Sequence, residues 1–141
     1  AGVLARRGNS ALVFRGHDNG LDELTSTTVN DVWVVANGEV TQETIDARAL
    51  GIAPSTVADL RGAEPATNAR IGREVLAGEQ GIIADTVALN AAAGMVAYGL
   101  EGTTEGTLLD RLGAGLEIAR EALRSGAAAG VVERWIAFTR N

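Results

Sequence analysis

The stretch from Thr86 to Leu100 constrains this chain most, because it carries no charged side chain. It belongs to a helical pattern that covers roughly residues 80–100. A membrane span needs about 20 predominantly apolar residues, and Asn90 and two glycines interrupt this one. A helix that is apolar on all sides in a water-soluble protein lies buried. The sequence therefore predicts a central helix in which small residues admit close neighbours and Asn90 needs a hydrogen-bonded partner.

Other helical patterns flank this central segment. Short helical turns are predicted at residues 1–8, 46–51 and 54–60, and longer helices from Pro65 to the stop at Gly78, over about 104–125 and over about 127–139. The pattern at 104–125 spaces its leucines three and four apart, which is typical of an amphipathic helix. Ser55 is the candidate cap of the turn at 54–60.

β-Strand patterns occupy the first third of the chain. Residues 10–15 hold a continuous apolar run, Leu12 to Phe14, which suits a strand covered on both faces of an α/β sheet. The dipeptide Asn37-Gly38 lies between two β-rich runs and predicts an antiparallel hairpin of residues 31–36 and 39–45. The fold class predicted is therefore α/β, with an antiparallel hairpin and a helical C-terminal half.

The composition narrows the classes of function. Hydrophobic residues make up 46% of the 141, which suits one domain with a sizeable core. No cysteine is present, so disulfides and thiolate metal sites are excluded, and a reducing cytoplasm is the expected location. The net charge is −6 and every basic residue is an arginine, which argues against nucleic acid or an anionic membrane as partner. The lack of lysine excludes a Schiff base.

The N-terminal residues predict a chain that is cut upstream. The apolar residues at the start precede Arg6 and Arg7, which is the reverse of the order in a signal peptide. The chain begins with Ala1 instead of an initiator methionine. The helical end at 1–8 is also too short to stand alone. We therefore expect residues 1–141 to be a piece of a larger protein.

A glycine-rich loop follows the strand at 10–15 and carries two adjacent carboxylates, Asp22 and Glu23. Ligands of open α/β sheets bind beyond the carboxyl ends of strands. Mg²⁺ is commonly held by one or two carboxylates together with the phosphates of a substrate. Asp22 and Glu23 are therefore candidate magnesium ligands in an enzyme that acts on a phosphorylated compound. Gly, Asp and Asn are also ordinary turn residues, so a merely solvated acidic pair is the alternative.

The polar residues around this pair each have two interpretations. His17 either contacts a phosphate or anchors the turn, and Asp18 either supports the metal site or caps the turn. Arg15 either approaches a phosphate or pairs with a nearby carboxylate. Trp33 either stacks on a substrate or packs within the sheet, and packing is the more common role of an aromatic side chain in a strand.

Several segments, in the same order along the chain, resemble the anthranilate phosphoribosyltransferase family. These segments are Ala11–Phe14 with Gly20–Thr25, Val32-Trp33 with Asn37–Val40, Asp59–Gly62 with Pro65–Ala69, Leu89–Ala93, and Ala119–Leu123 with Ser125–Ala128. The resemblance covers essentially the whole chain. The sequence Gly-Leu-Asp-Glu after an apolar strand is fairly specific, and the ordered set is more specific than any single piece.

The resemblance implies a reaction and a metal. The family transfers the phosphoribosyl group of phosphoribosyl pyrophosphate (PRPP) to the amine of anthranilate in tryptophan biosynthesis and releases pyrophosphate. By position, Asp22 and Glu23 would hold the Mg²⁺ that is bound to the pyrophosphate. Asn19 stands where relatives often have Asp, so no metal role is carried over to it.

The resemblance also implies an architecture, that of the nucleoside-phosphorylase-like phosphoribosyltransferases. These have a small helical domain and a larger α/β domain with a mostly parallel sheet. Residues 1–141 would be the C-terminal part of the large domain, with strand 10–15 added to the upstream parallel sheet and four helices packed behind it. The helical domain, a Gly-rich phosphate loop and the anthranilate-contacting residues would lie upstream.

It follows from the resemblance that the complete enzyme is a homodimer and that this chain alone is inactive. Two alternatives stay open at the level of sequence. One is a nucleic-acid-binding relative of the same fold, which would require a basic groove. The other is a relative of the pyrimidine-nucleoside phosphorylases, which would not need an acidic pair to place a magnesium pyrophosphate.

Overall fold

The computed structural model describes residues 1–140, which form an antiparallel sheet followed by a helical C-terminal half. In chain order the elements are α1 (Gly2–Arg6), β1 (Ala11–Gly16), β2 (Asn30–Ala36), β3 (Glu39–Ile45), the 3₁₀ helix η1 (Ala47–Leu50), α2 (Pro65–Leu76), α3 (Ile82–Tyr98), α4 (Leu108–Arg124) and α5 (Ala127–Thr139). The predicted α/β class, with a hairpin and a helical C-terminal half, is confirmed.

The sheet has the strand order β1-β2-β3, and both pairs of neighbours are antiparallel. The β2–β3 hairpin turns at Asn37 and Gly38, whose φ angles of 52° and 82° are the positive values that a tight two-residue turn requires. β1 lies at an edge of the sheet, and no second strand pairs with it among residues 1–140. The parallel neighbour expected for strand 10–15 therefore stays a prediction.

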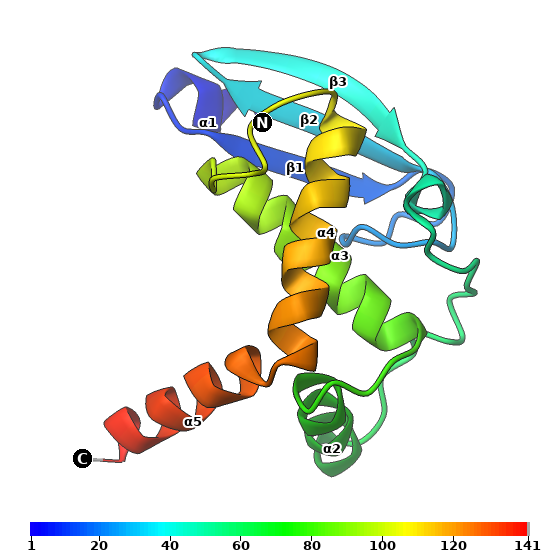
Figure 1. Ribbon diagram of the computed structural model, residues 1–141. Helices are drawn as coiled ribbons and strands as arrows, with labels where there is room; N and C mark the ends of the chain where they lie inside the picture. The colour runs from blue at the N-terminus through cyan, green and yellow to red at the C-terminus, as the bar shows by residue number, and fades with distance from the viewer. Residues whose placement is uncertain (141) are drawn as a thin grey trace.

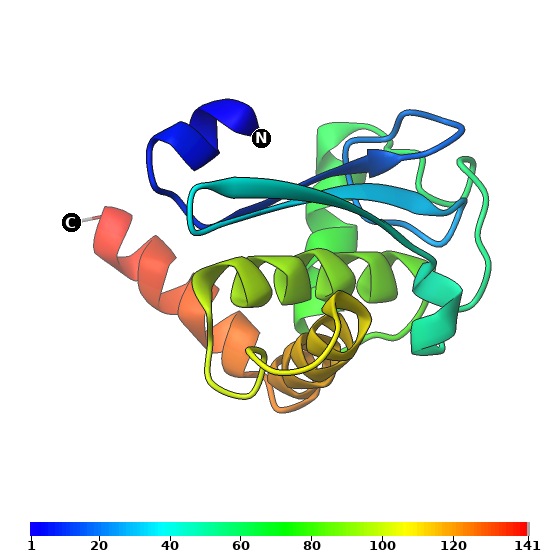
Figure 2. The same cartoon turned by 90° about the horizontal axis from the view of Figure 1, so that it is seen from above.

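The layers of the molecule are stacked around α3 (Figure 2). α3 lies against one face of the sheet, α4 crosses beneath α3, and α1 covers the opposite face of the sheet. The core between these layers is apolar and almost free of solvent. Its largest fully buried aliphatic side chains are Leu24, Val32, Leu89, Val96, Leu112 and Leu116.

The contact between α3 and α4 depends on small residues. A Cβ atom placed on Gly115 of α4 would lie 3.0 Å from the Cβ and 3.1 Å from the Cα of Ala92 on α3. Leu112 and Leu116 flank this point and are fully buried, as the leucine spacing predicted. α4 is capped by Thr107, whose hydroxyl accepts the Asp110 N–H while the Asp110 carboxylate accepts the Thr107 N–H.

The prediction of a central helix is confirmed, but α3 is not buried on every side. Its residues toward the sheet and α4 are buried, whereas Val87 is 46% and Tyr98 is 85% exposed. The sheet and α4 cover two sides of α3, and the side that carries Val87 stays partly exposed. None of the helices in these residues combines the length and the apolarity that crossing a bilayer requires.

Of the three short helical turns predicted, two are present and one is wrong. The turn at 1–8 is α1. The turn at 46–51 is η1, which ends at Gly51 with a φ of 76°. Residues 54–60 form no helix, because the Asp59 carboxylate accepts the N–H and hydroxyl of Thr56 and closes a local turn. Ser55 is not a cap, since its hydroxyl pairs with that of Ser26 at 2.8 Å.

The expectation that four helices pack behind the sheet is also wrong. α3 packs against the sheet and α4 packs on the other side of α3, while α2 and α5 lie at the far end of α4 and α5 projects away from the body (Figure 1). No residue of α5 is buried, and Trp135 and Phe138 are 67% and 81% exposed. The apolar side of α5 therefore has no cover within the described residues.

Candidate functional site

The loop between β1 and β2 presents the acidic pair at one end of the sheet. Asp22 and Glu23 are both exposed. Within residues 1–140, neither carboxylate has a hydrogen bond or an ion pair to another side chain or to the backbone. The two groups are therefore accessible to an ion.

The backbone before the acidic pair is held by its own loop. The Gly16 N–H donates to the Leu21 carbonyl at 2.7 Å, and the Gly20 N–H donates to the Gly16 carbonyl at 3.1 Å. The Asn19 side-chain oxygen accepts the Leu21 N–H at 3.1 Å. A Cβ on Gly16 would collide with that Asn19 oxygen, and Gly20 has a φ of 66°, so both positions favour glycine.

The backbone after the acidic pair is held by α3. The side chain of Leu24 is fully buried in the core. The Leu24 N–H donates to Asn90 Oδ1 at 3.0 Å, and Asn90 Nδ2 donates to the Leu24 carbonyl at 2.8 Å. Asp22 and Glu23 thus form a two-residue span between Leu21 and Leu24, whose backbones are both fixed.

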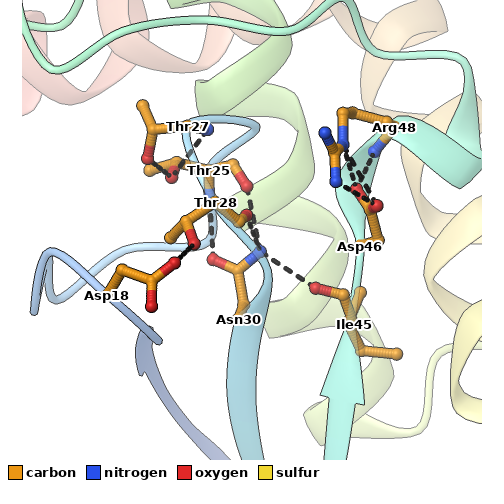
Figure 3. A network of polar contacts seen from close by, with 8 residues as sticks. All are labelled: Asp18, Thr25, Thr27, Thr28, Asn30, Ile45, Asp46 and Arg48. Atoms are coloured by element: carbon orange, nitrogen blue, oxygen red, sulfur yellow. Dashed lines mark hydrogen bonds and ion pairs between the residues drawn. The ribbon is translucent and has the colours of Figure 1, made fainter.

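Asn30, at the start of β2, holds the next residue of the loop in the same way. Its side-chain oxygen accepts the Thr25 N–H at 3.0 Å, and its Nδ2 donates to the carbonyls of Thr25 at 2.9 Å and Ile45 at 3.2 Å (Figure 3). Asn30 is fully buried, and β3 supplies the Ile45 carbonyl. The loop is therefore tied to the sheet as well as to α3.

Glu23 and Asn90 face one shallow groove of about 470 Å³. The groove runs between the acidic loop, the segment at 60–62, α2 and α3, and most of its remaining lining is apolar. Its other lining residues are Leu60, Arg61, Gly62, Asn68, Ile71, Gly72, Ile83, Thr86 and Val87. The groove places Glu23 beside the exposed side of α3.

The donor set of the loop fits a magnesium ion that is shared with a phosphorylated ligand. In the part of the chain that the structure describes, no group of three or more His, Cys, Asp or Glu side chains could enclose a metal ion. Two adjacent carboxylates leave most of the coordination sphere of Mg²⁺ to water and to ligand oxygens. Asp22 and Glu23 suit that arrangement and do not suit a closed structural site.

The neighbouring basic groups are paired with Asp31 of β2. His17 Nδ1 lies 2.9 Å from Asp31 Oδ1, and Arg15 Nε lies 3.4 Å from Asp31 Oδ2. The hydrogen bond with Asp31 raises the pKa of His17, and the same bond lowers the pKa of Asp31. Arg15 also lies over the Trp33 ring, 6.0 Å from its centroid. These contacts agree with His17 as an anchor of the turn and with Arg15 as the partner of a nearby carboxylate. Trp33 lies in β2 beneath Arg15, as expected of an aromatic side chain that packs within the sheet.

The side chains of Asp18 and Asn19 are also engaged within the loop. Asp18 Oδ2 accepts the Thr28 hydroxyl at 2.8 Å (Figure 3), and Asn19 Nδ2 donates to Thr27 Oγ1 at 2.8 Å. Asn19 also uses its oxygen for the Leu21 N–H. Both residues therefore shape the loop, as the turn-capping interpretation of Asp18 requires.

Sequence reasoning singles out the acidic pair but misses Asn30 and Asp31. Both are buried and polar at the start of an otherwise apolar strand, and this break in the pattern is the signal that could have found them. Asn90 is predicted to need a partner, and the structure supplies Leu24.

Comparisons with known proteins agree with this architecture. The family model described as the glycosyl transferase family, a/b domain, matches residues 1–129. An anthranilate phosphoribosyltransferase of Arthrobacter sp. (strain FB24) is 54% identical over 140 residues, which are 99% of this chain and 39% of that protein. One of Streptomyces avermitilis is 51% identical over 137 residues, which are 97% of this chain and 38% of that protein. The chain thus spans about two-fifths of the length of these relatives.

Solved structures show the same likeness. Anthranilate phosphoribosyltransferase from Thermus thermophilus matches with a TM-score of 0.82 and 36% identity, over 98% of this chain and 38% of that one. The enzyme from Saccharomyces cerevisiae in complex with PRPP and Mg matches with a TM-score of 0.75 over 91% of this chain and 34% of that one. Its identity of 23% shows the fold alone.

These matches are all to transferases, and they favour neither the nucleic-acid-binding alternative nor the phosphorylase alternative. The relatives from Arthrobacter, Streptomyces and Thermus carry the name of a phosphoribosyltransferase, as the resemblance in the sequence implied. Because the family model covers 129 of its 141 residues, this chain belongs to the glycosyl transferase family, a/b domain.

Proposed function

We propose that this chain is part of an anthranilate phosphoribosyltransferase and supplies the acidic loop that holds Mg²⁺ on the pyrophosphate of PRPP. The observation that carries the proposal is the exposed, unpaired Asp22-Glu23 span, fixed at both ends. Its sequence context supports the proposal, since relatives 54% and 51% identical to the chain bear that name. The yeast relative of the same fold was solved in complex with PRPP and Mg.

The role of this chain in the reaction is to bind and to orient. Displacement at the anomeric carbon of PRPP builds negative charge on the departing pyrophosphate. A magnesium ion, when bound there, neutralises that charge. Asp22 and Glu23 would hold such an ion from two adjacent positions, and the fixed backbone on either side would keep their carboxylates in place.

The amine of anthranilate is already nucleophilic, so the reaction requires no covalent intermediate on the protein. Positioning of the two substrates then supplies most of the rate enhancement. His17 and Asp31 are placed to support the loop from the sheet and need not touch the reacting atoms.

The remaining parts of the enzyme are proposals as well. Residues 1–141 would form the C-terminal part of the large domain in a cytoplasmic homodimer. The helical domain, the Gly-rich phosphate loop and the anthranilate-binding residues would come from the rest of the protein. This division is consistent with a chain that spans about two-fifths of its relatives. The isolated chain is then inactive because the second substrate has no site on it.

The test is the double variant Asp22→Asn, Glu23→Gln in the complete protein. Both substitutions keep the size of the side chain and remove its charge. We expect PRPP-dependent turnover of anthranilate to fall by about 10³-fold or more, because the charge on the leaving pyrophosphate is no longer offset. The loss of anthranilate fluorescence at saturating Mg²⁺ measures the rate of product formation.

A matched control removes two carboxylates elsewhere. Glu101 and Glu105 are exposed, lie beyond the C-terminal end of α3 and, within residues 1–140, have no hydrogen-bond or ion-pair partner. The double variant Glu101→Gln, Glu105→Gln should keep the turnover of the unaltered protein. Near-normal activity of the Asp22→Asn, Glu23→Gln protein in Mg²⁺ would count against the proposed function.

A further inference from the structure

The side-chain amide of Asn90, on α3, binds the backbone of Leu24 beside the acidic pair and the backbone of Thr86 on α3 itself. Its Oδ1 accepts the Leu24 N–H at 3.0 Å. Its Nδ2 donates to the Leu24 carbonyl and to the Thr86 carbonyl, each at 2.8 Å. The Thr86 contact lies one helical turn back on α3 and sets the direction in which the amide points. The two hydrogen bonds to the Leu24 backbone therefore come from a side chain whose own orientation is fixed.

Leu24, whose backbone Asn90 holds, follows Glu23 directly in the sequence. The Leu24 side chain is fully buried, so its position is set both by packing and by the two backbone bonds to Asn90. Glu23 and Asn90 also line the same groove. A shift of the Leu24 backbone is thus transmitted directly to the Glu23 carboxylate, since only one peptide bond separates the two residues.

Asn90 differs in its place in the fold from the other residues that form hydrogen bonds with the loop. Asn19 and Gly16 bind within the loop itself, and Asn30 begins the strand that follows it. Asn90 is 66 residues away from Leu24 in sequence and connects the loop to α3. Among the described residues, it is the sole hydrogen-bonded partner of the Leu24 backbone. Without it, a partly buried N–H and carbonyl would lack partners, and the backbone would have to move to find others.

We infer that Asn90 is a positioning residue for magnesium binding: it sets where the Glu23 carboxylate meets the ion that bridges to the pyrophosphate. The inference rests on the proposed function and adds to it a residue outside the acidic loop. A carboxylate displaced by about 1 Å loses much of its contribution at a site where geometry matters. Asn90 therefore acts on the magnesium-dependent part of PRPP binding and not on PRPP binding in general.

A purely structural amide would behave differently. It would lower the stability of the fold and the amount of active protein, but leave the affinity of each folded molecule unchanged. The readout that separates the two roles is the dissociation constant for PRPP, measured by isothermal titration calorimetry in excess Mg²⁺ and again in EDTA. The measurement uses the complete protein without anthranilate, so it does not depend on turnover.

The first variant is Asn90→Ala, which removes all three hydrogen bonds of the amide. We expect the Kd for PRPP in Mg²⁺ to rise about tenfold, a loss of about 1.4 kcal/mol, and the Kd in EDTA to stay that of the unaltered protein. Hydrogen exchange at the Leu24 amide should become faster in the same variant, because the Leu24 N–H loses its acceptor.

A second variant keeps the inference testable if Asn90→Ala does not fold. Asn90→Gln retains the amide and its capacity for hydrogen bonds but displaces it by one methylene, so pairing is kept while placement changes. We expect the Kd in Mg²⁺ to rise in this variant too. The control is Thr107→Ala, which removes the capping bonds of α4 and touches no residue of the loop. It should leave both dissociation constants unchanged.

The outcomes separate this inference from the proposed function. If the unaltered protein shows no magnesium-dependent binding of PRPP, the proposed function fails and the inference fails with it. If the unaltered protein binds PRPP in a magnesium-dependent way and a folded Asn90 variant has the same Kd in Mg²⁺, only the inference about Asn90 is overturned. A Kd that rises equally in Mg²⁺ and in EDTA also overturns it.

Discussion

At the scale of single residues, the His17–Asp31 pair shows how the loop is attached to the sheet. His17 Nδ1 and Asp31 Oδ1 are 2.9 Å apart, and the side chain of Asp31 is only 5% exposed. The pair joins the residue that follows β1 to the start of β2, at the point where the loop leaves the sheet. Its strength depends on pH because both groups titrate.

The sign of that dependence follows from the direction of the two pKa shifts. The pKa of His17 is raised above its ordinary 6.5, so its contribution is complete below about pH 6.5 and is lost as the pH rises through the folded value. The pKa of Asp31 is lowered from 3.8, so its contribution is present above that value and is lost only as the pH falls through the lowered one. The pair is therefore strongest in mildly acidic solution.

We expect His17→Ala to lower the melting temperature more at about pH 5.5 than at about pH 8.5, because only the protonated imidazole forms the ion pair. Thermal unfolding monitored by circular dichroism at both pH values measures the difference. An equal loss at both values would show that the charge on His17 contributes nothing and that the pair is a neutral hydrogen bond.

At the scale of elements, the close approach of α3 and α4 depends on one glycine. A Cβ on Gly115 would lie 3.0 Å from the Ala92 Cβ, whereas a Cβ on Gly94 of α3 would meet nothing within 4 Å. Both glycines lie inside helices, so an alanine has the same favourable effect on helix propensity at either position. The two positions differ in packing alone.

We expect Gly115→Ala to reduce the free energy of unfolding by about 1–2 kcal/mol, since overpacking outweighs the gain in propensity. Gly94→Ala, its matched control, should raise it by about 0.5–1 kcal/mol. Urea denaturation of the two variants measures both values. A Gly115→Ala protein as stable as the Gly94→Ala protein would contradict the described contact between α3 and α4.

The elements that sequence could predict are those defined by nearby residues. The hairpin at Asn37-Gly38 depends on the φ angles of two adjacent residues. The amphipathic pattern of α4 depends on leucines that are three and four residues apart. The helical prediction for residues 54–60 is wrong because Asp59 closes a local turn on Thr56. The predicted cap, Ser55, pairs instead with Ser26, which is 29 residues away, and no local pattern reveals that contact. The same limit applies at the site: the sequence predicts the exposed acidic pair, but the Leu24 partner of Asn90 is 66 residues away.

At the scale of the whole molecule, two of the surfaces that lack cover within residues 1–140 bear on the proposal. One is the free edge of β1, and the other is the apolar side of α5 with Trp135 and Phe138. Contiguous exposed apolar side chains mark surfaces that other protein segments cover. Both surfaces agree with the proposal that the chain works within a longer protein. The proposed parallel neighbour of β1 would belong to the rest of that protein.

We expect residues 1–141, produced alone, to form no phosphoribosylanthranilate from PRPP, anthranilate and Mg²⁺, while the complete protein does. Under the proposed function, the acidic loop would hold one end of PRPP, and the site for anthranilate would lie on the rest of the protein. The loss of anthranilate fluorescence measures both reactions side by side. Turnover by the isolated chain would show that the remaining part of the protein is dispensable for catalysis.

The most direct test of the proposed metal site is a crystal structure of the complete protein with PRPP and Mn²⁺, which replaces Mg²⁺ and scatters anomalously. We expect an anomalous peak that touches carboxylate oxygens of Asp22 and Glu23, at about 2.0–2.3 Å, and also touches the pyrophosphate. A peak on the pyrophosphate with both carboxylates directed away from it would contradict the assignment of this loop to the metal.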